Sequence, residues 1–409
     1  MPPRPMPPIT SLPFQNPALH PLHKVTVLQI IPGDEVTPAL RAAIDVAAAL
    51  NAVGARALVA CTDRLKGELQ AKGGIFLPLP ARSNNPLTMA LTVRRLARLI
   101  DAERADIVHV RSPELGWIAY GATRLTTTPL VTCFGAGDEG RNGIAARYNS
   151  VLARGDLVLA ESNFAAGLAA KHYAQKTGKI RVVPRGIDCQ IFAPSAVAPA
   201  RVEEVRRRWK VAPHEQVVLL PAPMSPGSGH KILIEAAGLL SRSGLAGVKF
   251  ILSISSRETA ACGRAIDRAI AGEGLQGIAY RASHCDTPAA LLAAATAIIP
   301  ATSPHALGEA ALQAQAMGTP VIASNLGAAP EIILTPPMVP EFSRTGFLAP
   351  PGDAPSLALT IANVLMLGAT ARSSLASRAI AHVEARYSAA RMCAEILKAY
   401  ADVRRGAVT

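Results

Sequence analysis

At 409 residues the chain is too long for one compact core and suits two domains of roughly 150–200 residues each. Half of the residues are hydrophobic and only 4% are aromatic, a composition that excludes a disordered or fibrous chain and favours helices packed on parallel strands. Lys and Arg outnumber Asp and Glu by 42 to 29, for a net charge of +13, but no basic run with interleaved aromatic residues indicates nucleic-acid binding.

The first half of the chain alternates short apolar runs with helical patterns. After a flexible proline-rich tail, expected over residues 1–22, the run Val25–Ile31 predicts a strand buried on both faces, and the alanine-rich segment Ala39–Val53 predicts a helix. A further helix is expected over residues 89–101. Further strands are expected at residues 55–61, 105–110, 130–134, 157–160 and 180–184.

The second half repeats this alternation. It predicts strands at residues 217–220, 248–253, 277–280, 297–300 and 320–323, and helices at residues 232–240, 288–295 and 310–317. Strands that alternate with helices indicate βαβ units and parallel sheets. We therefore expect an α/β protein with two Rossmann-like, doubly wound domains, residues 23–195 and 196–380, that face each other across a cleft. A long amphipathic helix within residues 381–409, with its pattern starting at Ala379, is expected to pack back across the junction.

Because ligands of open parallel sheets bind beyond the carboxyl ends of the strands, the functional site is expected in this cleft. Three motifs carry a resemblance to a known family. They are Lys179–Asp188 (KIRVVPRGID), the run from Pro304 through Gly308 and Gly318 to Glu331, and Thr345–Asp353 (TGFLAPPGD). Together they closely resemble glycosyltransferase family 4 of the two-Rossmann (GT-B) type, over a span from about Val25 to Val403.

Two further segments, Val108–Ser112 and Arg147–Asp156, look like a bacterial cell-surface polysaccharide subgroup of that family. The resemblance implies retaining transfer of a sugar from a nucleotide-diphosphate donor to a hydroxyl of a polysaccharide or glycolipid acceptor, as in lipopolysaccharide synthesis. It implies neither a metal nor a cofactor. Since the leaving group is a diphosphate, such a site needs positive charge and backbone N–H donors where negative charge develops.

Several family positions carry other residues here. Pro223 and Ser228 stand where the family has the arginine and the lysine that hold the diphosphate, and His305 and Gln313 stand where it has two glutamates. The histidine of the family's first domain falls near Gly135. Each loss removes charge or hydrogen bonding from the leaving group or the sugar, and the loss of a single such donor typically lowers the rate by about 10²–10³.

The remaining donor-side features are mainly backbone groups. Leu307 and Gly308 precede a predicted helix start, where N–H groups face an anion, although the charge of nearby Glu309 opposes a phosphate. Lys231 either reaches the donor or is a solvated lysine at a helix start. The donor-binding candidates are Gly229, Lys231, Leu307, Gly308, Glu309 and Glu331.

Two candidates concern the chemistry itself. His305 is either an acid or hydrogen-bond donor at the sugar or a loop histidine with no catalytic role, and Gln313 takes the place of a carboxylate. Glu331 follows a predicted strand and either caps a helix or contacts the donor.

On the acceptor side, Arg111 follows a predicted strand and either touches an acidic acceptor or forms a structural ion pair. Trp117 either packs in the core or stacks on the acceptor.

The six cysteines are scattered without a C-x-x-C pair, which argues for a reducing compartment and against a zinc site. The proline-rich start lacks the apolar segment of a signal peptide, so a cytoplasmic protein is expected. Its basic charge favours anionic lipid headgroups or phosphorylated substrates, and any membrane contact is expected to be peripheral, at the inner face.

Three hypotheses follow from these patterns. The first is an active glycosyltransferase with altered donor contacts. The second is a catalytically inactive pseudo-glycosyltransferase that acts as a binding or regulatory partner, because packing and chemistry are separate demands on a sequence. The third, a different enzyme on two Rossmann domains, requires an acid/base pair that the sequence does not reveal.

Overall fold

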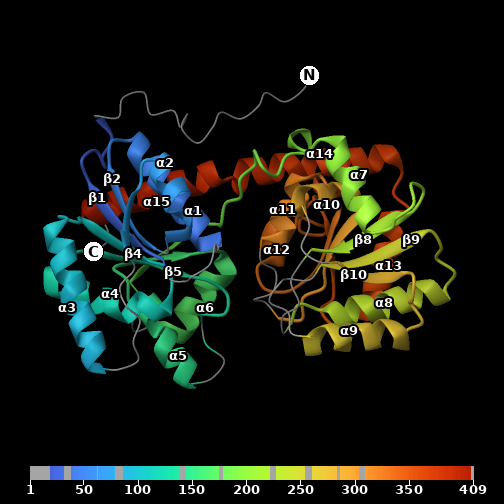
Figure 1. Ribbon diagram of the computed structural model, residues 1–409, viewed down its shortest axis with the longest axis horizontal. Coiled ribbons are helices and arrows are strands. Elements are labelled where there is room, and N and C mark those ends of the chain that lie inside the picture. The colour runs from blue at the N-terminus through green and yellow to red at the C-terminus, as the bar shows by residue number, and fades with distance from the viewer. Residues whose placement is uncertain are drawn as a thin grey trace. The chain divides into compact units, whose positions relative to one another are not determined.

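The computed structural model describes residues 19–31, 38–61, 63–78, 86–138, 140, 143–174, 178–221, 227–253, 260–282, 286–303 and 309–406. The chain divides into two compact units, the first comprising residues 1–186 and 389–409 and the second residues 187–388. Each unit is a parallel sheet with helices on both faces (Figure 1). These are the two Rossmann-like α/β domains expected from the sequence.

In the described part of the chain, the first sheet has seven strands in the order β3-β2-β1-β4-β5-β6-β7. Its strands are β1 (Thr26–Ile30), β2 (Arg56–Cys61), β3 (Ile75–Pro78), β4 (Ile107–Val110), β5 (Leu130–Phe134), β6 (Leu157–Ala160) and β7 (Lys179–Val182). The helices of this unit are α1 (Pro38–Ala52), α2 (Lys66–Ala71), α3 (Pro86–Ala102), α4 (Pro113–Thr126), α5 (Gly143–Asn149), α6 (Asn163–Tyr173) and α15 (Ala389–Arg404).

The second sheet has six described strands in the order β10-β9-β8-β11-β12-β13. They are β8 (Gln216–Leu220), β9 (Val248–Ser253), β10 (Ala279–Ala282), β11 (Thr296–Ile299), β12 (Val321–Ser324) and β13 (Phe347–Ala349). The helices are α7 (Pro199–Arg208), α8 (His230–Arg242), α9 (Ala260–Gly272), α10 (Thr287–Ala293), α11 (Ala310–Ala316), α12 (Ala329–Ile332), α13 (Ala354–Leu365) and α14 (Ala369–Arg386).

Side-chain alternation along the central strand builds the two cores of the first unit. Val27 of β1 joins the cluster that contains α1 and α15, whereas Leu28 and Ile30 join the cluster that contains α3 and α4. Because successive side chains of a strand point to opposite faces, an apolar run such as β1 is buried on both sides. In each sheet the strand order reverses next to the first strand of the unit, between β1 and β4 and between β8 and β11. Ligand sites of open α/β sheets lie at this switch point, beyond the carboxyl ends of the strands.

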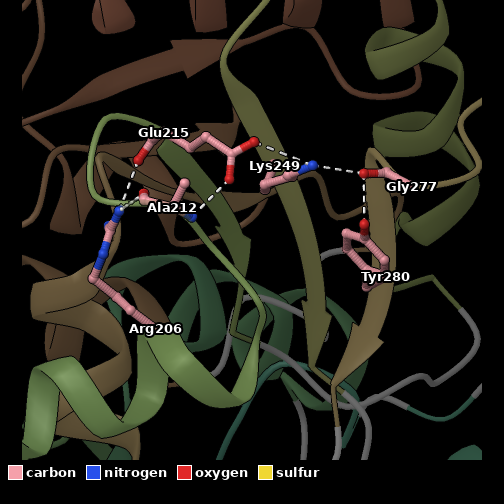
Figure 2. Close-up of polar contacts among 6 residues, drawn as sticks. All are labelled: Arg206, Ala212, Glu215, Lys249, Gly277 and Tyr280. Carbon is pink, nitrogen blue, oxygen red and sulfur yellow. Dashed lines mark hydrogen bonds and ion pairs between the residues drawn. The ribbon is translucent and has the colours of Figure 1, made fainter.

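Polar contacts connect the loops at the opposite, amino edge of the second sheet (Figure 2). Arg206 of α7 donates to the carbonyl oxygens of Ala212 (2.7 Å) and Glu215 (2.9 Å), and the Glu215 carboxylate accepts from Ala212 N (2.7 Å). Lys249 Nζ lies 3.2 Å from Glu215 and donates to the carbonyl oxygen of Gly277 at 2.7 Å. These residues hold the start of the sheet together, so they have a structural role.

The division of the chain differs from the predicted domain limits at the N-terminal tail and at the boundary between the two units. Leu22, placed in the flexible tail, is buried in the first core, while residues 1–18 lie outside the described ranges. The second unit begins at Ile187, nine residues before the predicted boundary at 195/196. Ile187 belongs there because it packs beside Leu312 and Val383 of the second unit.

The predicted long C-terminal helix from Ala379 to Val403 is wrong, because the structure divides it into α14 and α15. The break lies at Tyr387 and Ser388, where Tyr387 O accepts a hydrogen bond from Ile187 N (2.8 Å) and Ser388 bridges to Ile187. This backbone pairing competes with the helical hydrogen bonds of the same residues. Beyond the break, α15 packs on α1 in the first unit.

Within the described residues, no single helix has both the length and the apolar content needed to cross a bilayer. α13 and α14 reach these values only as a pair, and they are bent by 108° relative to each other.

Candidate functional site

A pocket of about 260 Å³ lies at the carboxyl edge of the first sheet, and we call it the edge pocket. The loops after β4, β5, β6 and β7 and the helices α1 and α15 form its walls. It is lined by Ala39, Ala42, Arg111, Cys133, Gly135, Ala136, Asp138, Leu159, Glu161, Val183, Arg185, Met392 and Ile396. Its place beyond the carboxyl ends of the strands is where open parallel sheets bind ligands.

Two polar contacts organise the charged residues of the edge pocket. Arg185 Nη2 lies 2.6 Å from Glu161 Oε1, so the arginine after β7 and the carboxylate after β6 form an ion pair. Asp138 Oδ2 accepts a hydrogen bond from Gly135 N at 2.8 Å, which holds the turn after β5. This turn carries the position where the family resemblance places a histidine, and here Gly135 has no side chain to contribute.

Arg111 lines the same pocket, directly after β4. Its Nε and Nη2 atoms are buried, and neither has a hydrogen-bond partner within the described residues. The sequence left two interpretations of Arg111, contact with an acidic acceptor or a structural ion pair. Among the described residues, Arg111 forms no ion pair. The adjacent Ser112 is the N-cap residue of α4, but its hydroxyl makes no cap hydrogen bond.

A buried chain of three polar side chains runs beneath the edge pocket. The fully buried residues Tyr400 of α15 and His109 of β4 meet at 2.6 Å, through the hydroxyl and Nδ1, and His109 Nε2 lies 3.1 Å from Cys133 Sγ. If the tyrosine hydroxyl donates to Nδ1, the neutral ring carries its proton on Nε2 and donates to the sulfur. In this arrangement the tyrosine hydroxyl and the histidine N–H each donate one hydrogen bond. The thiol hydrogen of Cys133 is then available to donate to a group in the edge pocket.

The surroundings keep all three groups uncharged. Burial and then the charge of Arg111 hold the pKa of His109 well below its usual value. Burial raises the pKa of the Cys133 thiol to about 11 and raises that of Tyr400 above its normal range. Cys133 is therefore a thiol rather than a thiolate at neutral pH, which excludes ready nucleophilic reaction.

We expect the protein to lose stability as the pH falls below about 6.5, the usual pKa of an exposed histidine. His109 takes up a proton in the unfolded chain there but stays neutral when folded, so the free energy of unfolding should fall by up to about 1.4 kcal/mol per pH unit. Urea unfolding at pH 7, 6 and 5 measures this slope. The His109→Gln variant lacks the titrating group and should show a shallower slope. An equal slope would contradict the assignment to His109.

Trp117 lies on α4 but does not line the edge pocket. Its Nε1 donates to the carbonyl oxygen of Tyr148 at 2.9 Å, and the Arg154 guanidinium lies over its ring, 5.2 Å from the centroid. With Ile144 and Tyr148 it borders a separate hollow of about 880 Å³. Both the indole N–H and the ring of Trp117 therefore have partners in the first unit, and Trp117 does not line the pocket that contains Arg111.

In the second unit, a turn with two glycines follows β8 at the switch point. Gly227 has φ +85° and Gly229 has φ +78°, in the left-handed region that glycine adopts without strain. A Cβ on Gly229 would lie 1.7 Å from the carbonyl oxygen of Pro300, and Gly227 O accepts from Thr302 N at 2.7 Å. The turn is therefore packed against the segment that follows β11, and Gly229 is the N-cap residue of α8.

The residue between these glycines is Ser228, where the sequence resemblance places the family's lysine. Ser228 and His230 are both buried, and Ser228 Oγ lies 2.9 Å from His230 Nδ1. Lys231, one residue further along α8, is exposed. The buried pair fixes the start of α8, whereas the lysine is the cation that this helix start presents to solvent.

The other donor-side candidates are only partly described. Glu309 precedes α11 as its N-cap residue, and Gln313 Nε2 donates to its carboxylate at 3.5 Å. Glu331 lies in the first turn of α12 and its carbonyl oxygen accepts from the Tyr387 hydroxyl at 2.7 Å. Pro223, His305, Leu307 and Gly308 lie outside the described residues.

Sequence reasoning missed most of the edge pocket. Gly135 and Glu161 each follow the last residue of a strand, β5 and β6, so the rule that ligands bind beyond carboxyl ends would have selected them. No local signal connects Tyr400 to His109, because 291 positions separate them. Within the described part of the chain, no group of three or more His, Cys, Asp or Glu side chains is arranged to hold a metal ion.

Comparison with known proteins assigns each half of the chain to a domain type. Residues 40–191 match Glycosyltransferase Family 4, and residues 215–366 match Glycosyl transferases group 1. A curated relative, D-inositol 3-phosphate glycosyltransferase of Segniliparus rotundus, is 30% identical over 191 residues. This match spans 44% of the chain and 39% of the relative.

Solved structures agree with the fold of the whole chain. A glycosyltransferase from Rickettsia africae superposes with a TM-score of 0.80 and 26% identity over 93% of this chain and 98% of that one. Anabaena HepE in complex with UDP gives a TM-score of 0.76 and 20% identity, with 92% and 100% of the two chains covered. WaaG, a glycosyltransferase involved in lipopolysaccharide biosynthesis, gives 0.65 and 15%, with 93% and 100% covered. The chain therefore has the GT-B fold, and its two halves resemble a Glycosyltransferase Family 4 domain and a Glycosyl transferases group 1 domain.

Proposed function

We propose that the protein transfers a sugar from a nucleotide-diphosphate donor to a hydroxyl of an acceptor, with retention of the anomeric configuration and without a metal. In this reaction the C1–O bond to the diphosphate breaks and its electron pair stays on the phosphate oxygen. The acceptor oxygen bonds to C1 and its proton is released. The rate depends on groups that stabilise the negative charge of the leaving diphosphate.

The observation that carries this proposal is the turn Gly227–Gly229. It lies after β8 at the switch point of the group 1 domain and precedes α8, whose first N–H groups lack partners within the helix. A glycine at 229 lets the backbone approach its neighbours closely, and a helix start with free N–H groups favours an anion. The diphosphate of the donor suits this position.

We place the acceptor in the edge pocket of the first unit, where guanidinium and carboxylate groups suit the hydroxyls of a sugar. A polysaccharide or glycolipid acceptor accords with the likeness to WaaG, which is involved in lipopolysaccharide biosynthesis. With such an acceptor the protein would work in the cytoplasm, in peripheral contact with the inner face of the membrane, where its net charge of +13 favours anionic lipid.

A second candidate function is that of a binding or regulatory partner without catalytic activity. Ser228 stands at the family's lysine and bonds to His230, and Gln313 stands at a family glutamate and bonds to Glu309. Neither residue supplies charge to a diphosphate or to an oxocarbenium-like sugar. This observation favours a protein that keeps the fold and has lost the rate enhancement.

Calorimetry with UDP, GDP and ADP, followed by product analysis with the matching nucleotide sugar, separates the two functions. We expect one nucleotide to bind with micromolar affinity and its sugar to be transferred or hydrolysed, with activity retained in EDTA. Binding without turnover would support the binding partner instead. No binding of any nucleotide would contradict a donor site at the Gly227–Gly229 turn.

Lys231 should contribute to donor binding, because it is the exposed cation on the first turn of α8. We expect Lys231→Ala to weaken nucleotide diphosphate binding about tenfold, measured by calorimetry at low salt. Arg242→Ala is the matched control, since it removes an exposed cation from the last turn of the same helix. Equal effects of the two variants would indicate general electrostatics and no contact of Lys231 with the donor.

A further inference from the structure

Three buried donor atoms gather where the chain leaves β4. They are Nε and Nη2 of Arg111 and the hydroxyl of Ser112, and none has a hydrogen-bond partner within the described residues. An unsatisfied buried polar group typically costs about 1–3 kcal/mol, and more when it is charged, so such a group in a native protein calls for an explanation. Two adjacent residues with this property, at the switch point of the sheet, point to a ligand.

Arg111 differs in this respect from the other charged residues that line the edge pocket. Arg185 is paired with Glu161, and Asp138 accepts from the backbone of Gly135. Among the described residues neither carboxylate forms an ion pair with Arg111, so its guanidinium has no direct anionic partner in the pocket wall. The positive charge of the Arg111 guanidinium also contributes, after burial, to the lowered pKa of the nearby His109.

The start of α4 follows Arg111 directly in the chain, and its first turn also carries Glu114. Arg111 and Ser112 directly precede α4, a helix of 14 residues whose N-cap side chain makes no hydrogen bond to the first turn. Helix starts carry a partial positive charge and N–H groups without helical partners. A guanidinium and a helix start on consecutive residues form a combination that favours an oxyanion.

We propose that the edge pocket holds an oxyanion group of the acceptor, a phosphate or a carboxylate, and that Arg111 is the residue that binds it. The pocket volume of about 260 Å³ is slightly below the roughly 300–1,000 Å³ of sites that enclose a drug-sized ligand, so it takes the charged end of the acceptor. This inference rests on the proposed function, because it specifies the substrate class of the acceptor site. Arg111 thereby sets specificity: acceptors without the charge leave the guanidinium unpaired.

Calorimetry on the full-length protein tests the proposal, with glucose 6-phosphate, glucuronate, glucose and inorganic phosphate as probes. We expect glucose 6-phosphate or glucuronate to bind more tightly than glucose. Whichever of these two charged sugars binds more tightly identifies the anion as a phosphate or a carboxylate. Arg111→Gln should weaken this binding by about 10–100-fold, whereas Arg111→Lys should retain part of it. Arg124→Gln removes an exposed arginine from the far end of α4 and should leave the affinity unchanged.

Three results would overturn the proposal. They are equal affinities for glucose and both charged sugars, unchanged binding in Arg111→Gln, and binding of inorganic phosphate as tight as that of glucose 6-phosphate. Circular dichroism and thermal unfolding verify that each variant is folded. Binding of UDP, GDP and ADP, measured on the same proteins, separates this inference from the proposed function. If none of the three nucleotides binds to any of the proteins, the donor site is contradicted, whereas loss of sugar-anion binding in Arg111→Gln alone supports the acceptor assignment.

Discussion

Replacing Tyr400 by alanine should destabilise the first unit by about 3–5 kcal/mol, the range for removing a large aromatic side chain from a core. The ring is fully buried in the cluster that joins α15 to α1, and it packs edge-on to His109 with centroids 5.7 Å apart. Truncation leaves a cavity and removes the hydrogen-bond partner of His109 Nδ1. An effect of this size is a large part of the stability of an ordinary domain.

The two tryptophans allow this effect to be measured in one unit at a time. Trp117 lies in the first unit and Trp209 in the second, so a Trp209→Phe background leaves Trp117 fluorescence as the reporter for urea unfolding of the first unit. Tyr400→Phe is the matched variant: it keeps the ring and should cost about 1–3 kcal/mol through the unsatisfied imidazole. A loss below about 1 kcal/mol for Tyr400→Ala would show that α15 is not part of the first core.

Replacing Gly229 by alanine should have the largest effect in the second unit. The new Cβ would meet the Pro300 carbonyl oxygen at 1.7 Å, and φ is +78°, so both the turn and the segment after β11 must move. The backbone conformation costs about 1–2 kcal/mol and the overpacking about 1–3 kcal/mol more. We also expect nucleotide diphosphate binding to weaken at least tenfold, because the displaced turn is the proposed diphosphate site.

Gly244→Ala is a close control for this substitution. Gly244 follows the other end of α8 with φ +88°, but a Cβ added there would have no atom within 4 Å, so only the backbone cost applies. Urea unfolding followed through Trp209, in a Trp117→Phe background, should therefore give a smaller loss of about 1–2 kcal/mol. Equal losses for the two variants would contradict the close packing of the Gly227–Gly229 turn.

Much of the fold was predictable because hydrophobic periodicity is local. The strands at Leu130–Phe134, Leu157–Ala160 and Val248–Ser253 have the bounds expected from their apolar runs. The edge strands β3 and β13 were not assigned as strands, since β3 has no buried residue and ends in Pro78, and β13 has only three residues. The break between α14 and α15 was missed because it depends on pairing with Ile187, far away in the sequence.

The candidate site was less predictable than the fold. Arg111 was found by its position after a strand, and the structure places it in a pocket. Lys231 was found from its place in the family pattern and is exposed at the start of α8. The contacts that decide what these residues do involve atoms distant in the sequence, such as Tyr400 and His109. Side-chain pairing over such separations follows from packing, which no local pattern encodes.

The position of α15 bears on how the protein is made. Because its residues complete the core of the first unit, we expect that unit to close only after α15 has been synthesised. The second unit, residues 187–388, is contiguous and already has its full sequence by then. The usual order, in which the N-terminal domain matures first during translation, is therefore reversed. Until α15 has been synthesised, the apolar face of α1 lacks this partner, and we expect chaperones to matter most at that stage.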